Sequence, residues 1–298
     1  MGGISAIASI LKIAASAKPI KVILAYTPIF RRSKLSFLST PWFSLKITTP
    51  NIRIKLAAAY GLNDREIILP EMAAMAVGLW VYRDKQWLNQ PDKIFILPSL
   101  TAVIGFCINL MPISYLFKLV LVLCAMLFVM RMFNYILPPA LATGFLPIVT
   151  QAYEISFLIS IFATSFILML GVVLFKLNQG VERKGNFDRR KIGVYASITL
   201  IGFALAAIFK VEAMALIPPI TVVVYESLNM MMYSLKMCLK QIAALTLSIS
   251  MAVLMQLWIQ DWILLTLIYM PLMFLLLKLF DMRIPAVYAF PFLVFVFP

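Results

Sequence analysis

The sequence contains no histidine. Its charged residues (Asp, Glu, Lys and Arg) make up only 13% of the 298 positions. Without histidine there is no Ser–His or Cys–His nucleophile pair and no HExxH zinc site. The chain also lacks the GxxxxGK[ST] loop that would bind ATP phosphates. The only aspartates near the later apolar segments, Asp261 and Asp281, stand at segment ends, which disfavours an aspartyl protease. We therefore expect no enzyme, no metal and no cofactor.

Cysteine is scarce as well, with only Cys107, Cys124 and Cys238 present. All three lie in apolar stretches without paired spacing, so we expect buried small side chains and no disulfide framework. The first apolar segment has Lys12 in its middle and no basic leader, which does not fit a cleaved signal peptide.

Apolar residues are in large excess. They form 63% of the chain, and the mean hydropathy is +0.99. Soluble domains are about 45–50% apolar and about 25% charged. No soluble core of this size could hide so much apolar surface, so we predict an integral membrane protein whose outer face contacts the lipid bilayer.

Basic residues outnumber acidic ones, 26 to 12. They are concentrated in short loops between apolar segments, mainly before residue 67 and from Lys176 to Lys191. The positive-inside rule places such loops on the cytoplasmic side. We therefore expect a multi-pass protein of the cell (plasma or inner) membrane, with loops 31–34 and 183–191 cytoplasmic and no nucleic-acid partner.

Spanning helices need about 17–25 mostly apolar residues. The pattern predicts an all-α bundle of about 10–12 membrane segments. Three candidates are short or interrupted by proline, and two near the N-terminus carry lysine or arginine, so whether they span stays open. The strong candidates are 93–111, 113–133, 155–176, 193–209, 214–232, 240–257 and 262–280; the short ones are 67–83, 136–152 and 284–298; the N-terminal ones are 4–29 and 45–62.

Four regions follow from this pattern. They are a basic N-terminal region (1–66), a first membrane half (67–176), a basic cytoplasmic loop (177–191) and a second membrane half (192–298).

An internal repeat connects the two halves. Four apolar segments open with Leu or Ile followed by proline, at Pro70, Pro138, Pro218 and Pro285. The first and third prolines are 148 residues apart, and the second and fourth are 147 apart. We interpret this as a duplication.

Within each half the motif recurs after 68 or 67 residues, with two candidate helices in between. A three-helix unit would alternate in orientation and so give inverted repeats within parallel halves. This alternation of orientations requires segment 45–62 to cross the membrane as well.

Proline suits the first turn of a helix, because its missing N–H would lack an intrahelical partner there anyway. A helix that starts inside a membrane directs its free N–H groups at protein, water or a ligand. Inverted-repeat transporters place such broken helices around the substrate. The alternative is that these prolines only kink packed helices.

The stretch RMFNYILPPALATGFLPIV (131–149) resembles the motif helix of the HPP family of integral membrane proteins. The region from Pro70 through QPDKIFILPSLTAVIGF is similar to the part upstream of that motif, and the second half resembles a diverged copy. Leu137 stands where the family has its histidine. The resemblance implies a helical membrane protein, with the nitrite transport proposed for plastid members as the expected kind of activity.

Polar residues near the prolines are candidates for a substrate pathway together with the motif prolines, including Pro139 and Pro219. Glu71 and Glu226 are intramembrane carboxylates that could carry protons. Arg131 and Lys278, each seven residues before a proline, could attract an anion. Each candidate has an alternative role. Glu71 would satisfy the free N–H groups in the first turn of its own helix, and Arg131 and Lys278 would extend to the membrane interface. The remaining two candidates, Thr143 and Thr221, would bond to the backbone of their own helices.

The sequence thus favours a transporter of a small ionic solute, preferably a nitrite-like inorganic anion moved with a proton. A cation or zwitterion is the alternative if the carboxylates stay charged, and a non-transporting scaffold or subunit is the alternative class. Whether the chain forms a homo-oligomer is left open.

Overall fold

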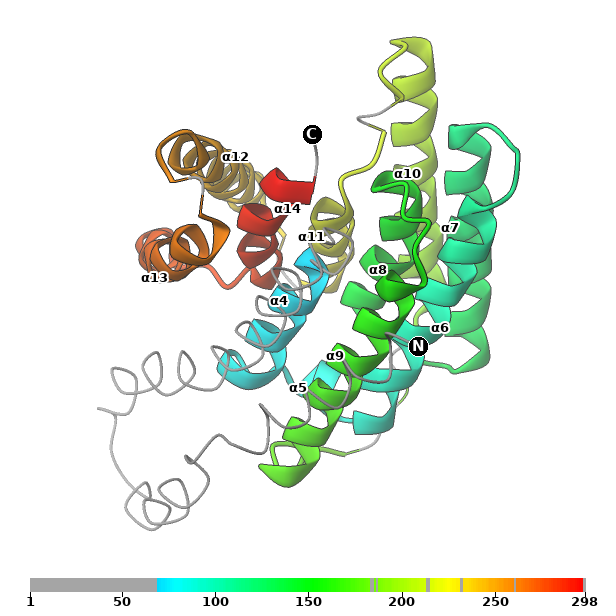
Figure 1. The fold of residues 1–298 in the computed structure, drawn as a ribbon. Helices are drawn as coiled ribbons and strands as arrows, with labels where there is room; N and C mark the ends of the chain where they lie inside the picture. The colour runs from blue at the N-terminus through cyan, green and yellow to red at the C-terminus, as the bar shows by residue number, and fades with distance from the viewer. Residues whose placement is uncertain are drawn as a thin grey trace, which may run out of the picture. The chain divides into compact units, whose positions relative to one another are not determined.

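The computed structural model describes residues 69–182, 185, 187–212, 215–230, 233–259 and 261–296. The chain divides into two compact units, Met1–Asp64 and Arg65–Pro298, and every described residue belongs to the second. The predicted segments 4–29 and 45–62 and the loop 31–34 lie outside the described residues. Within the described ranges all regular elements are helices (Figure 1), which confirms the predicted all-α class.

Five helices in the described part are long and apolar enough to cross a membrane. Their exposed residues are largely bulky hydrophobics such as Leu174, Ile208 and Leu257. Apolar surface on this scale fits hydrocarbon rather than water. The five are α6 (Pro91–Asn109), α7 (Tyr115–Met132), α9 (Ile155–Leu174), α10 (Arg189–Ile208) and α12 (Leu235–Trp258), and α13 (Trp262–Leu279) packs against α12.

A second class of helix is short, and each of its members begins at a motif proline. Both α8 (Pro138–Val149) and α11 (Pro218–Asn229) have 12 residues. The other two change type along their length: α4 (Pro70–Ala76) continues into the π-helix η3 (Val77–Val81), and the 3₁₀-helix η5 (Pro285–Ala289) continues into α14 (Phe290–Val296). Two long helices separate each short segment from the next, with the four-residue α5 (Lys85–Leu88) as an addition after η3.

The four proline starts share one backbone geometry. The residue before each proline is extended, with φ between −111° and −122°, because a following proline disfavours the helical region there. In each start the N–H of the third helical residue donates to the carbonyl of the residue before the proline. These bonds are Met72 to Leu69, Ala140 to Leu137, Ile220 to Ile217 and Val287 to Ile284.

Two long helices begin earlier than the sequence predicts. Helix α10 starts at Arg189, inside the predicted loop 177–191, because the Asp188 side chain accepts the N–H of Arg190 at 2.9 Å. Likewise α12 starts five residues early, where the Ser234 hydroxyl accepts the N–H of Met237 at 3.3 Å. Capping side chains therefore extend both helices into charged sequence.

Side-chain contacts show which helix ends lie together. The Lys93 ammonium sits 4.0 Å from the ring centroid of Phe133, so α6 begins where α7 ends. The Lys191 ammonium donates to Asn229 Oδ1 at 3.0 Å, which places the start of α10 beside the end of α11. Lys240 donates to the carbonyl of Phe280 and joins the start of α12 to the end of α13.

Further contacts connect these pairs of helix ends, and we call the connected set of helix ends the basic end. Gly185, before α10, lies against Asn134 at the end of α7. Tyr82 hydrogen-bonds Tyr288 and so joins the end of η3 to η5. Among the basic residues that the structure describes, those beside these helix ends are Arg83, Lys85, Lys93, Arg131, Lys176, Arg189, Arg190, Lys191, Lys236, Lys240, Lys278 and Arg283, whereas Lys118 and Lys210 lie beside the other helix ends.

The short helices run in opposite directions between these ends. Both α4–η3 and α11 finish at the basic end, whereas α8 and η5 start there. Helix α4 packs against η5, and α8 packs against α11, so each of these pairs is antiparallel.

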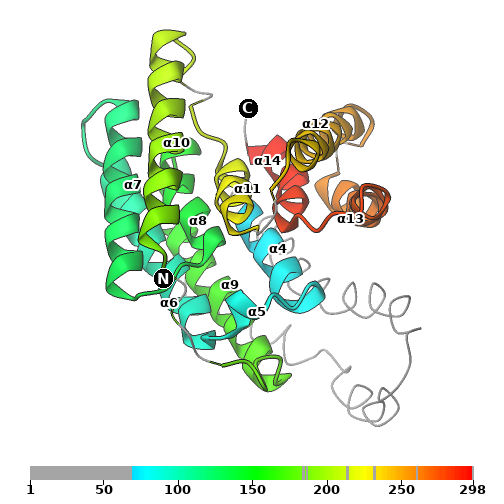
Figure 2. The same cartoon turned by 180° about the vertical axis from the view of Figure 1, so that it is seen from behind.

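Two hydrophobic clusters fill the unit, and the short helices lie where the clusters meet (Figures 1 and 2). The first cluster is built mainly from α4 to α10, and the second mainly from α11 to α14. Val77 of η3 and Ala142 of α8 belong to the second cluster, while Tyr225 of α11 belongs to the first. We call this junction of α4, η3, α8, α11 and η5 the seam.

Candidate functional site

The seam brings the four proline motifs into one neighbourhood. Helix α4 contacts α8, α11 and η5, and α11 contacts α8 and η5. Segments more than 200 residues apart in sequence therefore pack side by side. The candidate residues carried by these helices are buried, except for Glu226, which is half-buried.

Glu71 is almost completely buried, with 1% of its surface exposed. It occupies the first turn of α4, next to Pro70. The partial positive charge of a helix start stabilises a carboxylate there. Burial of this residue in a chain of apolar helices makes it the strongest ionisable candidate in the seam.

Glu226 stands in the last turn of α11, close to the basic end. Its carboxyl group is within electrostatic range of Asp84 and of the Tyr82 hydroxyl. Arg283, directly before the fourth motif, also acts on Tyr82. The basic end of the seam thus gathers acidic, basic and phenolic side chains from α11, from the connection between η3 and α5, and from the residues before η5.

A hydrogen bond between two tyrosines connects the first and last short segments. The hydroxyl oxygens of Tyr82 and Tyr288 are 3.4 Å apart, although 206 residues separate them in sequence. Tyr82 follows the π-helix η3, and its N–H donates to the carbonyl of Val77. Single π-helical turns are frequent at functional sites.

Thr143 and Thr221 hydrogen-bond within the protein. The Thr143 hydroxyl donates to the carbonyl of Ala140 and lies 2.9 Å from the hydroxyl of Thr101 in α6. Thr101 also approaches the carbonyl of Leu97 at 2.9 Å. The Thr221 hydroxyl donates to the carbonyl of Pro218 at 2.7 Å. Both hydroxyls thus bond to the backbone of their own helix, and Thr143 also links α8 to α6.

In two of the motifs a second proline follows the first, and it changes what the start of the helix can bind. Pro139 and Pro219 remove the N–H of the second helical residue, and the third N–H already bonds to the residue before the motif. Helices α8 and α11 therefore offer their dipole to a solute but few backbone donors. Pro70 and Pro285 are each followed by a residue that keeps its N–H.

Arg131 and Lys278 are not brought into the seam. Their side chains are exposed in the last turns of α7 and α13, at the basic end. A cation at the end of a helix is stabilised by the partial negative charge there. Asn134 follows α7 and Asp281 follows α13, and both take positive φ, at 48° and 53°. The ends of the two helices therefore share their local geometry.

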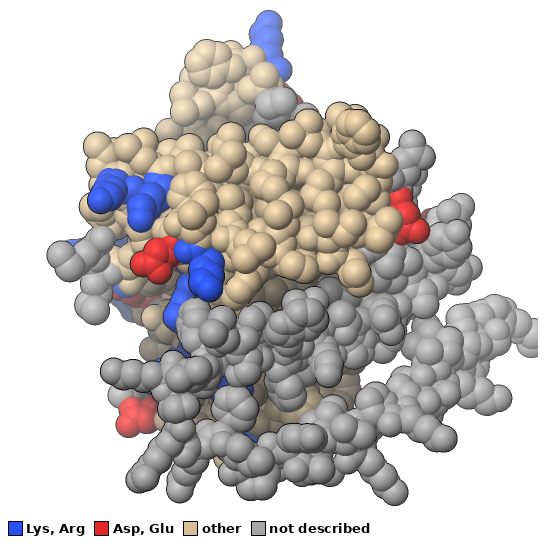
Figure 3. Space-filling model, turned by 90° about the vertical axis from the view of Figure 1, so that its left-hand side faces the viewer, with Lys and Arg blue, Asp and Glu red and all other residues tan. Residues whose placement is uncertain are grey.

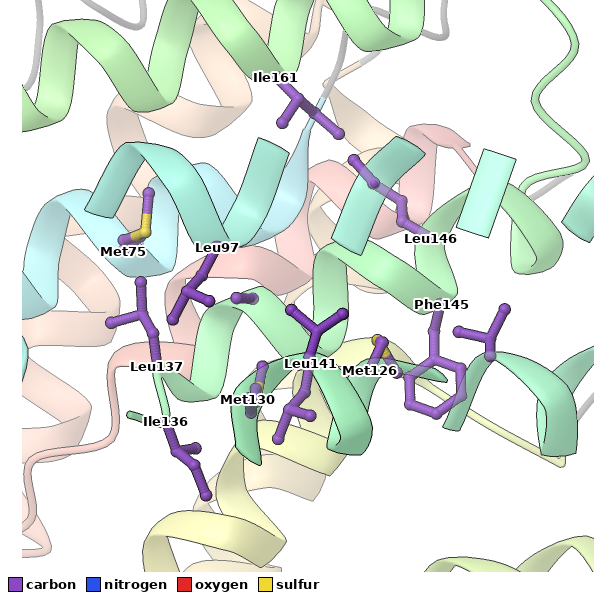
Figure 4. Packing of buried hydrophobic residues seen from close by; sticks show 14 of the residues in the cluster. Met75, Leu97, Met126, Met130, Ile136, Leu137, Leu141, Phe145, Leu146 and Ile161 are labelled. Atoms are coloured by element: carbon purple, nitrogen blue, oxygen red, sulfur yellow. The ribbon is translucent and has the colours of Figure 1, made fainter. Parts of the chain in front are cut away.

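Leu137 is fully buried in an apolar environment. Figure 4 shows its side chain beside those of Met75 and Leu97, within the first hydrophobic cluster. A histidine at this position would need a polar partner for its ring nitrogens. These neighbours fit the leucine that the sequence has.

Two groups near the basic end have perturbed ionisation. Burial raises the pKa of the Asp84 carboxyl, although the N–H groups of Gln86 and Trp87 partly offset the effect. Burial also raises the pKa of the Tyr135 phenol, and the charges of Asp84 and Asp92 add to this. The Tyr135 hydroxyl donates to the carbonyl of Gln86 at 2.5 Å, which fastens α5 to the α7–α8 connection.

Sequence reasoning missed Tyr82, Asp84, Thr101, Arg283 and Tyr288. A signal was present only for Tyr288, which follows its motif proline by three residues, as Thr221 does. Within the described ranges, no three His, Cys, Asp or Glu side chains are grouped so that they could hold a metal ion.

Comparison with known proteins adds no relative to this picture. No protein-family model, curated protein or solved structure matches the chain. The resemblance to the HPP family therefore stays a prediction.

Proposed function

We propose that the protein is a membrane carrier that moves a small solute through the seam. The observation that carries this proposal is the set of four proline-started short helices, packed as antiparallel pairs inside the unit. A 12-residue helix is about 18 Å long, against about 30 Å of hydrocarbon. Helices of this kind begin or end within the membrane, where their polar ends need partners.

The element order supports an internal repeat. One short and two long helices recur three times, and a fourth short helix follows. Because consecutive short helices run in opposite directions, the units are proposed to be inverted repeats, and residues 67–176 and 192–298 to be parallel halves. With segments from residues 1–66 the total would be 10–12. Carriers with inverted repeats bind substrate near the repeat interface, which here is the seam.

The charge distribution supports one orientation. Within the described ranges, most lysines and arginines lie at the basic end, and Lys118 and Lys210 lie at the other helix ends. The positive-inside rule then favours a cytoplasmic location for the basic end, as it does for loop 183–191, in a protein of the plasma or inner membrane.

The proposed solute is a small inorganic anion, nitrite-like in size, moved together with a proton. The dipoles of α8 and α11 favour negative charge at their starts. Glu71 is the proposed proton carrier, because a buried carboxylate must be neutral before an anion can approach it. We leave Arg131 and Lys278 out of the pathway because both side chains are exposed.

A non-transporting scaffold is the second candidate. The observation in its favour is that α8 is buried from Pro138 to Ile148, with Thr143 already bonded to Thr101. A carrier in a closed state would be packed in the same way, so uptake has to decide between the two.

The experiment is uptake by proteoliposomes loaded at alkaline internal pH and offered nitrite, nitrate, chloride or a sodium salt of a large anion. We expect nitrite uptake driven by an inward proton gradient. Glu71→Gln should abolish the proton dependence, whereas Glu154→Gln, at the exposed opposite end, should behave like the wild type. Arg131→Ala and Lys278→Ala should retain uptake. Vesicles with protein that take up no more solute than empty ones would support the scaffold, and sodium uptake lost in Glu71→Gln would support a cation carrier.

A further inference from the structure

We infer that the basic end of the α12–α13 hairpin is a binding site for the headgroup of an anionic phospholipid. Four basic residues form this site: Lys236, Lys240, Lys278 and Arg283. The inference depends on the membrane location of the helices and not on the proposed transport.

The helices bring the four side chains together. Lys236 and Lys240 are four residues apart in the first turns of α12 and so lie on one face. Lys240 donates to the carbonyl of Phe280 at 3.3 Å, which holds the end of α13 alongside. Lys278 is in the last turn of α13, and Arg283 follows shortly after it.

The cluster carries an excess of positive charge. Lys236, Lys278 and Arg283 are exposed, and Asp281 is the one acidic residue of the described hairpin end. In the part of the chain that the structure describes, none of the four basic residues forms an ion pair with a carboxylate. Figure 3 shows several blue basic groups at one end of this face with a red acidic group among them, and another red group at the far end across a broad apolar surface.

Exposed leucines adjoin the cluster. Leu235 is 76% exposed and Leu239 58%, while Leu275 is 60% and Leu279 81% exposed on the facing helix. A phosphate headgroup would satisfy the basic side chains while its acyl chains cover these leucines. Lysine and arginine at a helix end extend their charged groups to the lipid phosphates in this way. A soluble anion or a nucleic acid would leave the apolar surface uncovered.

The test is lipid binding by the full-length protein in detergent, measured by native mass spectrometry with phosphatidylglycerol and with phosphatidylcholine. The wild type should bind phosphatidylglycerol preferentially. In the combined variant Lys236→Gln, Lys240→Gln, Lys278→Gln and Arg283→Gln, we expect affinity for phosphatidylglycerol to fall by about tenfold or more, with phosphatidylcholine binding unchanged.

A matched control removes four exposed basic residues from the same end of the unit but outside the hairpin: Lys85→Gln, Lys176→Gln, Arg189→Gln and Arg190→Gln. It should keep the preference, and inorganic phosphate should not compete with the lipid. If the fourfold variant unfolds, the double variant Lys236→Gln, Lys278→Gln should show part of the loss. Equal binding of both lipids by the wild type, an equal loss in the control, or displacement by inorganic phosphate would overturn the inference.

Discussion

A β-carbon added to Gly105 of α6 would lie 2.0 Å from the carbonyl oxygen of Gly144 in α8. Two backbones therefore touch at this point, next to the Thr101–Thr143 contact. Small residues allow such close crossings in membranes, where packing and hydrogen bonds rather than the hydrophobic effect hold helices together.

Gly105→Ala should destabilise the fold because the added methyl group meets backbone, which cannot move aside as a flexible side chain can. Overpacking of this kind costs about 1–3 kcal/mol. The measurement is thermal unfolding in detergent, followed by tryptophan fluorescence, because Cys107 and Cys124 are exposed rather than buried as predicted and so would not report unfolding. Gly202→Ala in α10 is the control, since a methyl group there meets nothing within 4 Å. Equal melting temperatures for Gly105→Ala and Gly202→Ala would contradict the close crossing.

Thr143→Val tests whether this threonine packs helices or contacts solute. As a packing residue it should lose about 0.6 kcal/mol of stability, the average for a hydrogen bond between membrane helices. Thr101→Val should lose a similar amount, and the double variant should lose less than the two single variants combined. Solute uptake by Thr143→Val should stay near the wild-type rate. Additive losses of stability would show that the two hydroxyls do not interact.

Local chemistry explains which parts of the fold could be predicted. Proline fixes its own φ and restricts the residue before it, so Pro138 and Pro218 marked helix starts directly in the sequence. Long apolar runs likewise predicted the five long apolar helices, but the described part of the run 214–232 contains only the 12-residue α11, because Pro218 starts the helix late. Helix α12 starts five residues before the predicted segment because the Ser234 hydroxyl caps it, so that the charged Lys236 lies inside the helix.

Pairings between distant segments had no comparable signal. Nothing in the sequence near Tyr82 indicates Tyr288, because their contact depends on how α4 packs against η5. The crossing of Gly105 and Gly144 also requires knowing that α6 and α8 are neighbours. The exposure of Arg131 depends on which face of α7 turns outward, and an all-round apolar helix leaves that face undetermined.

Asp84 should give stability a pH dependence. Burial raises its pKa in the folded protein above that of the unfolded chain, so the folded state holds the proton more tightly. Stability contributed by this residue is therefore greatest below the usual carboxyl pKa of about 3.9 and falls as the pH rises through the raised pKa.

The matching variant is Asp84→Asn, since asparagine caps a helix about as well as aspartate and the side chain accepts the N–H of Gln86. It should melt at a higher temperature than the wild type at pH 7, and the difference should vanish near pH 4. A variant that is less stable at pH 7 would mean that the charged form is favoured in the fold.

The proposed passage of solute through the seam requires η3 and η5 to move apart, and locking these two segments together tests the proposal most directly. After Cys107, Cys124 and Cys238 are replaced by serine, Tyr82→Cys and Tyr288→Cys place two thiols on opposite sides of the seam. A reducible bifunctional thiol reagent, long enough to span the space of the two phenol rings, is then applied to proteoliposomes. We expect nitrite uptake to stop in the double variant, to return after reduction, and to continue in either single variant. Undiminished uptake by fully cross-linked protein would contradict the account.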